Sequence, residues 1–387
     1  MALFKGSRRD DPLEPLRADS DRYRILGFLG KGRLADVSTA FDGRLGRMVA
    51  AKYLRKENLD KPENVRSFLN EAKLISYLDH PGVVSIYDAF IGENDEPCYT
   101  MRLIEGHNLA WDLKSKTRGQ LLHICTKLCE TLAYVHDKGV VHLDLNPNNV
   151  LLGSHGQVMI TDWGNARLYE PKAYHEYLKL VRDAPPPPLD EDAHPKMGTP
   201  QYMSPEQTRG EREALTPSSD IFSLGVILYL TMTGTLPFSG SDREALFEQI
   251  RTYDPPLLHE ASPDIPVRLS HICARMLKKD PFERYHNFHQ VLQDLDRFHN
   301  SGEAFQLVRY NKGDVVFREG DAGDFALCVV EGSVEVLREI EGRQKVIATM
   351  GKDEIVGELA IFTGEKRTGT VRAVQDGTII RVMGRQA

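Results

Sequence analysis

The 387-residue sequence predicts an α+β protein in which a small β-rich lobe and a larger helical lobe are followed by an all-β domain. Three observations predict this order. Residues 23–90 combine strand-like apolar segments with one amphipathic helix, and helical patterns dominate from residue 121 onward. After about residue 300, glycines separate or flank short apolar segments, a density of turn signals that is typical of a β-sandwich or barrel.

The bilobal part is predicted element by element. Residues 23–29 and 48–54 are rich in apolar residues and have Gly30 and Gly46 beside them as turn signals, which predicts strands. Apolar positions at helical spacing predict helices further along. These expected helices cover residues 65–78, 121–135 and 220–233.

The all-β part is expected to form a β-sandwich or barrel. Its expected strands cover residues 315–317, 326–330, 333–337, 345–350 and 377–382. A boundary is predicted near residues 299–302. The expected domains are an N-terminal extension (1–21), the bilobal domain (22–298) and the all-β domain (303–387).

Composition narrows the class of protein. The net charge of −7 and pI of about 6.0 give no sign of a nucleic-acid or anionic-membrane partner. The first residues lack the apolar segment of a signal peptide, and the longest mostly apolar run, 221–232, is too short to span a membrane. An odd count of five cysteines favours a reducing, cytoplasmic setting. Cys125 and Cys129 fit a metal pair with His123 or, as we expect, two buried core thiols.

The most informative stretch is HLDLNPNN at residues 142–149, followed by DWG at 162–164. Phosphoryl transfer from ATP needs a carboxylate that orients a hydroxyl, and an amide with a second carboxylate that hold magnesium. The stretch resembles the catalytic loop and the magnesium loop of protein kinases. This resemblance implies that Asp144 orients the substrate hydroxyl and that Asn149 and Asp162 hold Mg²⁺.

A nucleotide site is implied by the same resemblance. GKGRLADV at residues 30–37 is similar to the glycine-rich loop, with Ala35 in place of the third glycine, although a plain glycine-rich hairpin is the alternative. Lys52 corresponds to the lysine that holds the phosphates, and Glu71 to its partner. Met101 would guard the adenine pocket. The implied ATP-binding residues are Gly30, Lys31, Gly32, Val37, Ala50, Lys52, Met101, Arg102 and Ile104, with backbone groups of Arg102 and Ile104 on the adenine.

GTPQYMSPE at residues 198–206 closely resembles a segment of bacterial-type serine/threonine kinases. By this resemblance, Thr199 bonds the catalytic Asp144, Glu206 forms a buried salt bridge with Arg284, and Asp220 holds the backbone of the catalytic loop. The resemblance to protein kinases covers residues 23–298. It implies a bilobal protein-kinase fold and ATP-dependent phosphorylation of serine or threonine in protein substrates.

Three departures from the family pattern bear on activity. Asn146 stands where the family carries a lysine that contacts the γ-phosphate. Losing such a stabiliser lowers the rate by a factor on the order of 10²–10³. Lys31 or Arg33 could restore the charge in space. The alternative is a pseudokinase or weakly active signalling scaffold that binds ATP and a cyclic nucleotide. Trp163 replaces phenylalanine.

The third departure, Leu143, replaces the arginine that receives a phosphate on the activation segment. Residues 165–198 contain no serine or threonine, so we expect no phosphorylation switch there; activation of this segment that a phosphatase reverses would contradict that. Residues 165–197 are expected to be an extended, acidic, exposed insert. Asn108 and Asn148 predict no strong preference for basic residues near the target hydroxyl.

GELAIFTGEKRTGTV at residues 357–371 resembles the phosphate-binding cassette of cyclic-nucleotide-binding domains. The resemblance implies that Arg367 takes the cyclic phosphate and Glu358 the ribose hydroxyl. The implied ligand is cAMP or cGMP, and a β-domain that has lost its ligand is the alternative. The resemblance also implies a β-roll. The sequence ends before the lid helices of that family, so either the protein is naturally short or the sequence is a fragment. The implied binding residues are Gly357, Glu358, Leu359, Ala360, Arg367 and Thr368.

Overall fold

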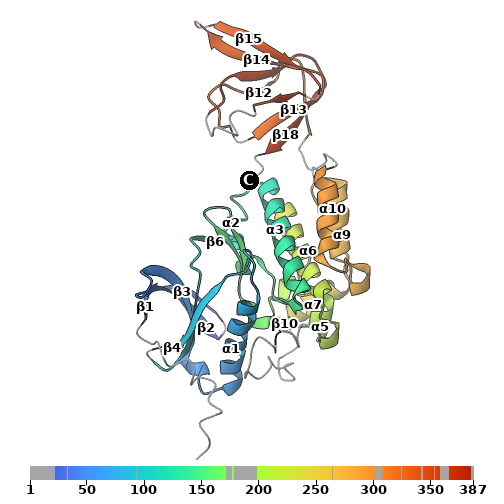
Figure 1. Ribbon diagram of the computed structural model, residues 1–387. Coiled ribbons are helices and arrows are strands. Elements are labelled where there is room, and N and C mark those ends of the chain that lie inside the picture. Colours follow the sequence, from blue (N-terminus) through green and yellow to red (C-terminus); the bar gives the residue numbers. More distant parts are fainter. Residues whose placement is uncertain are drawn as a thin grey trace, which may run out of the picture. The chain divides into compact units, whose positions relative to one another are not determined.

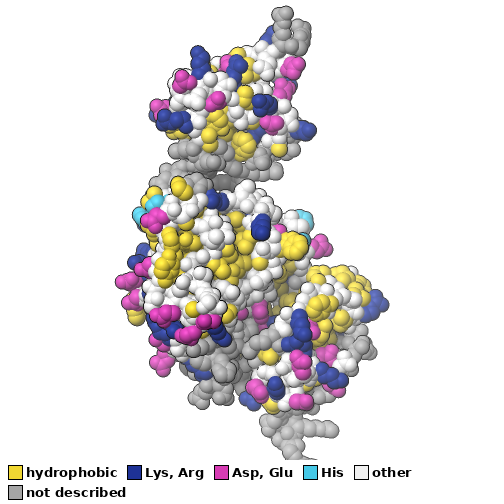
Figure 2. Space-filling view, turned by 180° about the vertical axis from the view of Figure 1, so that it is seen from behind, with side chains coloured by type: hydrophobic (Ala, Val, Ile, Leu, Met, Phe, Trp, Pro, Cys, Tyr) yellow, Lys and Arg dark blue, Asp and Glu magenta, His cyan; other side chains and the backbone are white. Residues whose placement is uncertain are grey.

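The computed structural model describes residues 22–32, 34–92, 94–170, 177, 198–263, 265–300, 307–323, 325–340, 343–352, 354–357 and 366–384. The expected N-terminal extension therefore lies outside the described residues. Contacts divide the chain into two units, Met1–Leu292 and Gln293–Ala387, each of which is described by itself (Figure 1). Within each unit, acidic and basic side chains are interspersed on the face in Figure 2, in keeping with 49 Lys and Arg against 56 Asp and Glu.

The small lobe is an antiparallel five-stranded sheet with one long helix (blue in Figure 1), and it includes the two strands and the helix that the sequence predicted. The strand order is β1-β2-β3-β5-β4. The strands are β1 (Tyr23–Lys31), β2 (Ala35–Asp42), β3 (Arg47–Leu54), β4 (Ile86–Ile91) and β5 (Pro97–Met101). The helix is α1 (Pro62–Tyr77), in which a proline at the first helical position starts the helix without losing a hydrogen bond.

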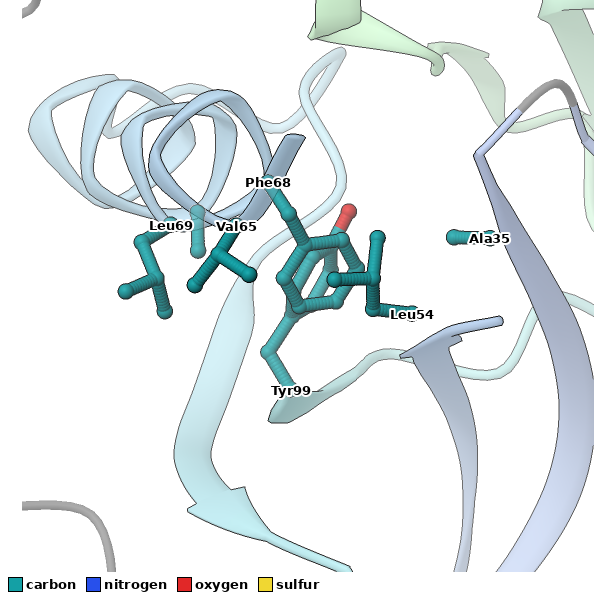
Figure 3. Close-up of a cluster of buried hydrophobic side chains, with 7 residues drawn as sticks. Ala35, Leu54, Val65, Phe68, Leu69 and Tyr99 are labelled. Carbon is teal, nitrogen blue, oxygen red and sulfur yellow. The ribbon is translucent and has the colours of Figure 1, made fainter. Parts of the chain in front are cut away.

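Helix α1 is held against the sheet by apolar packing. It contributes Val65, Phe68 and Leu69 to a cluster that also contains Leu54 from β3 and Tyr99 from β5 (Figure 3). The rings of Phe68 and Tyr99 lie 5.1 Å apart. Burying such side chains contributes about 1.5–3 kcal/mol each. This cluster sets the distance between α1 and β3, which carry Glu71 and Lys52.

The large lobe is built around α6 (Pro217–Thr233), in which nearly every side chain is buried. A helix that is apolar on all sides must lie inside the fold. Helix α3 (Arg118–Asp137) packs on it and starts with a capping box formed by Thr117 and Gln120. Among the described residues, no helix is both long and apolar enough to cross a membrane.

Shorter elements complete this lobe. The helices are α2 (Leu109–Asp112), α5 (Pro205–Arg209), α7 (Arg243–Thr252), α8 (Leu258–Ala261), α9 (Val267–Met276) and α10 (Phe288–Asn300). The strands are β6 (Gly106–Asn108), β8 (Val150–Gly153) and β9 (Val158–Ile160) in one sheet, and β7 (Val140–Val141) and β10 (Arg167–Leu168) in another. The 3₁₀ turns η4 (Pro147–Asn149) and η5 (Trp163–Asn165) carry site residues.

The cysteines of this unit are buried thiols. Cys98, Cys125, Cys129 and Cys273 are inaccessible, and Cys125 contacts the hydroxyl of Thr231. Burial raises the pKa of the Cys125 thiol to about 12, so it stays protonated at neutral pH.

The C-terminal unit contains two four-stranded sheets with a shared core. One sheet has the order β11-β18-β13-β16 and the other β12-β17-β14-β15. The strands are β11 (Leu307–Tyr310), β12 (Val315–Phe317), β13 (Phe325–Glu331), β14 (Val334–Ile340), β15 (Arg343–Met350), β16 (Ile355–Val356), β17 (Thr370–Ala373) and β18 (Thr378–Gly384). All five expected strands are present. The sequence patterns missed β11, β16 and β17, which are four residues long or shorter.

The expected buried pair of Glu206 and Arg284 forms, and both side chains are fully buried. The guanidinium donates two parallel hydrogen bonds of 2.8 and 2.9 Å to the carboxylate oxygens, and the hydroxyl of Ser219 donates a third. Burial by itself would raise the pKa of Glu206, but the hydrogen bonds and charge of Arg284 outweigh it and hold that pKa below its ordinary value.

We predict that Arg284→Met lowers the free energy of unfolding by about 3–5 kcal/mol at pH 7, because it leaves a buried carboxylate without its partner. The contribution of the pair should be present above the ordinary carboxyl pKa of about 4.3 and should be lost as the pH falls below it. Urea unfolding at several pH values measures both effects.

The control is Lys127→Ala, which breaks the exposed pair of Lys127 and Glu130. Exposed pairs contribute about 0.2–1 kcal/mol, so the urea midpoint of Lys127→Ala should stay close to that of the wild type. Equal losses in the two variants would contradict the importance of the buried pair.

Candidate active site and ligand site

Lys52, Glu71 and Asp162 converge although they lie far apart in the sequence. The Lys52 Nζ lies 2.6 Å from Glu71 Oε1 and 3.7 Å from Asp162 Oδ1. The hydroxyl of Tyr99 donates to the same oxygen of Glu71 at 3.1 Å. Burial opposes the charge of Lys52, but the carboxylates of Glu71 and Asp162 outweigh it and raise the pKa above its ordinary value. Lys52 is therefore a fixed cation at the floor of this site.

The catalytic loop, residues 142–149, is anchored on α6 through Asp220. Its carboxylate is fully buried and accepts hydrogen bonds of 2.8 Å from the backbone N–H groups of His142 and Leu143. His136 bonds the same carboxylate at 2.8 Å. The contact expected between Asp220 and the loop backbone is thus present.

His142, the first residue of the loop, is held by hydrogen bonds of its own ring and by the ring of Trp163. The Nδ1 of His142 accepts the N–H of Asp144, and its Nε2 bonds the carbonyl of Thr161 at 3.1 Å. A carbonyl can only accept, so His142 is the neutral Nε2–H tautomer. Trp163 packs edge-on against His142 at 4.7 Å and donates its indole N–H to the carbonyl of Ile160. Tryptophan therefore fills the place of the usual phenylalanine and adds a hydrogen bond.

Asp144 is bound by Thr199 in two ways. The backbone N–H and the hydroxyl of Thr199 donate to Asp144 Oδ1 at 2.8 and 2.9 Å. The Asn149 side-chain N–H₂ donates to the backbone carbonyl of Asp144 at 2.9 Å. The side-chain oxygen of Asn149 is therefore directed away from that carbonyl. With the half-exposed carboxylate of Asp162, that oxygen gives the hard ligand set that Mg²⁺ prefers. The residues present fit a magnesium site.

Asn146, where the family carries lysine, is buried and fully engaged. Its amide N–H₂ donates to Asp144 Oδ1 at 3.2 Å and to the Thr199 hydroxyl at 3.0 Å. Its carbonyl oxygen accepts the N–H of Asn148 and so caps η4. Asn146 therefore holds the Asp144 carboxylate but adds no charge. Of the residues suggested to replace that charge, Lys31 is exposed and Arg33 lies outside the described residues.

Asn165 also binds the catalytic carboxylate, which the sequence patterns did not indicate. Its amide donates to Asp144 Oδ2 at 3.2 Å. It follows directly after the DWG motif, at the end of η5. A polar residue at that position carries no signal on its own.

Leu143 is buried in an apolar cluster with Val141 and Leu215, and Tyr169 packs against them. Leu143 adopts a left-handed backbone with φ of 63°. The place of the usual arginine is thus taken by apolar contacts that need no phosphate. Tyr177 is buried and lies edge-on to Tyr77 at the end of α1. The proline and acidic residues 185–192, from which an exposed insert was expected, lie outside the described residues.

The predicted nucleotide-binding residues line up along β1, β2, β3 and the segment after β5. Gly32 closes the hairpin by donating its N–H to the carbonyl of Ala35, and a Cβ there would lie 2.9 Å from that oxygen. Val37 pairs with Lys52 in the sheet, and Ala50 with Met101. The Arg102 N–H donates to the carbonyl of Ser85, so its carbonyl is the backbone group left for adenine.

In the C-terminal unit, Arg367 is buried. Its guanidinium donates to the carbonyls of Gly357 and Phe325 and lies over the rings of Phe317 and Phe325 at 4.2 and 4.4 Å. Thr368 is exposed beside it. Three residues expected to bind the cyclic nucleotide lie outside the described residues, namely Glu358, Leu359 and Ala360.

A lysine–glutamate pair beside one carboxylate, with a second carboxylate on an anchored loop, defines an ATP-dependent phosphotransferase of the kinase class. The model of the protein kinase domain matches residues 23–295, and the chain belongs to the protein kinase family. The model of the cyclic nucleotide-binding domain matches residues 307–386.

Curated relatives agree with this family. The chain is 35% identical over 295 residues to serine/threonine-protein kinase PknD of Chlamydia abortus, covering 71% of this chain and 31% of the relative. It is 28% identical over 381 residues to PknD of Protochlamydia amoebophila, covering 92% and 38%. It is 29% identical over 338 residues to PrkC of Bacillus subtilis, covering 86% and 48%. The chain thus spans less than half the length of each.

We predict that Gly357→Ala destabilises the C-terminal unit by more than the cost of placing alanine in a left-handed backbone. Gly357 has φ of 83°, and a Cβ there would lie 2.6 Å from Nη1 of Arg367. Left-handed backbone costs alanine about 1–2 kcal/mol, and displacing the buried arginine adds to that. Thermal unfolding of the full chain measures the loss.

Gly313→Ala is the control, because Gly313 has φ of 91° and nothing within 4 Å of a Cβ. Its loss of stability therefore measures the cost of a left-handed alanine alone. Equal losses in both variants would show that the contact of Gly357 with Arg367 contributes nothing.

Proposed function

We propose that this chain transfers the γ-phosphoryl group of ATP to serine or threonine hydroxyls of protein substrates. The observation that carries the proposal is the convergence of Lys52 on Glu71 and Asp162 beside an anchored Asp144. A lysine–glutamate pair that is already formed is one of the conditions for an active kinase. The names of the relatives support serine and threonine as acceptors.

The residues have distinct tasks in this reaction. Asp144 accepts the proton of the substrate hydroxyl, whose oxygen bonds the γ-phosphorus while the bond to the bridging oxygen breaks and leaves ADP. Lys52 holds the α- and β-phosphates, and Gly30 and Gly32 let the loop approach them. Asn149 and Asp162 would hold Mg²⁺, which offsets negative charge on the phosphates.

The alternative is a scaffold that binds ATP and a cyclic nucleotide with little catalysis. Asn146 favours it, since no lysine charge reaches the γ-phosphate from that position. The observed contacts favour a slow enzyme instead, because Asn146 still binds Asp144 and Thr199. Lys52, Glu71, Asn149 and Asp162 are all present.

The C-terminal unit is proposed to bind a cyclic nucleotide and to control the kinase domain. The match to the cyclic nucleotide-binding domain supports binding, with Arg367 as the cation for the cyclic phosphate. Burial of its guanidinium between two rings means that its contacts must rearrange when a phosphate binds. Whether the ligand is cAMP or cGMP stays open, and the cytoplasmic location remains a prediction.

The enzyme prediction is tested by radiolabelled phosphate transfer from ATP to casein, with the full chain and with Asp144→Asn. We expect transfer by the wild type and a loss of at least about 10²-fold in the variant, since general bases contribute that much. Equal inactivity would favour the scaffold. Adding cAMP or cGMP should change the wild-type rate, and an unchanged rate with both would contradict nucleotide control.

A second prediction concerns Asn146→Lys. The ammonium restores a charge near the γ-phosphate, and such stabilisers contribute on the order of 10²-fold. The cap on Asn148 and the amide bonds to Asp144 and Thr199 are lost, so we expect a smaller net rise in kcat of about tenfold. Steady-state kinetics measure it, with Asn146→Ala as the matched control, which loses the amide without gaining a charge and should fall below wild type. A lysine variant as slow as the alanine variant would show that charge is not limiting.

A further inference from the structure

The two oxygens of the Asp144 carboxylate are in different surroundings. Oδ1 accepts the N–H and hydroxyl of Thr199 and the amide of Asn146, at 2.8 to 3.2 Å. Oδ2 accepts the Asn165 amide at 3.2 Å. Each carboxylate oxygen offers about two lone-pair sites. Oδ1 is therefore saturated, whereas Oδ2 retains a site for one more donor.

We propose that Asn165 is a positioning residue for phosphoryl transfer, which holds Asp144 Oδ2 as the oxygen that receives the substrate proton. The proposal rests on the proposed kinase function. The proton of the serine or threonine hydroxyl passes to Oδ2, the hydroxyl oxygen bonds the γ-phosphorus, and the electrons of the broken bond leave with ADP. Asn165 acts through Asp144 and keeps the open lone pair of Oδ2 in one direction.

The backbone of Asn165 is fixed well enough for this task. It ends η5, which begins with Trp163, and Trp163 is 1% exposed. The indole N–H is bonded to Ile160, and the Ala166 N–H closes the turn on the carbonyl of Trp163. A buried aromatic anchor two residues earlier thus places the amide of Asn165 against Asp144.

Asn165 also connects the two halves of the site. The residue before η5 is Asp162, which lies 3.7 Å from Lys52 and is predicted to hold Mg²⁺. One short turn therefore carries a metal ligand at its start and a clamp on the base at its end. In this arrangement of the turn, Asn165 contacts Asp144 while Asp162 lies near Lys52.

A purely structural role for Asn165 is the competing explanation. Within the described part of the chain, the side-chain hydrogen bond of Asn165 goes to Asp144 and none goes to its own turn. The turn is closed by backbone groups of Trp163 and Ala166. Removing the amide should therefore leave the turn intact and disturb the base alone.

The test measures kcat, KM for ATP and the thermal midpoint of the full chain with casein as the acceptor. Asn165→Leu keeps a similar size without a donor. We expect its kcat to fall on the order of 10–100-fold, because misplacement of a catalytic group by about 1 Å costs up to 10²-fold. KM for ATP and the midpoint should stay near wild type. Asn165→Asp should lose more, because a second carboxylate repels Asp144.

Asn165→Gln supplies the same donor on a longer arm and should recover part of the kcat that leucine loses. If Asn165→Leu keeps kcat within threefold of wild type, the proposal is wrong. If ATP affinity and the midpoint fall together with kcat, the role is structural and the proposal is equally wrong. An inactive wild type overturns the proposed function and this proposal with it, whereas an active wild type with unaffected variants overturns this proposal alone.

Discussion

The carboxylate of Asp220 is the constraint on which the site depends. It lies fully buried on α6 and binds the backbone N–H groups of His142 and Leu143. Leu143 is left-handed, which costs a residue other than glycine about 1–2 kcal/mol. Hydrogen bonds to a charged group are worth about 1.5–3 kcal/mol each, and Gln207 adds another bond to the carbonyl of Leu143, so the strain is outweighed. Because Leu143 precedes Asp144, this strained backbone helps to place the carboxylate proposed as the catalytic base.

On the same loop, apolar packing of Leu143 takes the place of the arginine charge that is usual in the family. Burial of Leu143 against Val141 and Leu215 contributes about 1.5–3 kcal/mol that is always present. An arginine at this position would bind the segment strongly only after a phosphate arrived. These apolar contacts need no modification, and residues 165–198 contain no serine or threonine, so the expectation of no phosphorylation switch stays a prediction.

Sequence reasoning succeeded where a pattern has a single physical meaning. The spacing of apolar residues located α1, α3 and α6, and the buried pair of Glu206 and Arg284 was expected from its motif. It failed where a residue acts through geometry that no spacing records. Asn165 lies 21 residues from Asp144, and only the turn after Trp163 brings its amide to the carboxylate. The patterns gave no sign that Tyr177 is buried, because only the fold brings its ring against Tyr77.

The magnitudes decide between a slow enzyme and a scaffold. The family's lysine charge is missing at the position of Asn146, and the loss of such a stabiliser costs about 2.7–4 kcal/mol of transition-state stabilisation. Holding reactants and catalytic groups in place contributes up to about 7–11 kcal/mol, and that part depends on orientation rather than on the missing charge. Asn146, Thr199 and Asn165 keep Asp144 oriented, and Glu71 keeps Lys52 in place. The proposal of a kinase with a reduced rate therefore rests on the larger contribution, which these contacts can supply, and the scaffold alternative rests on the smaller one, which is lost.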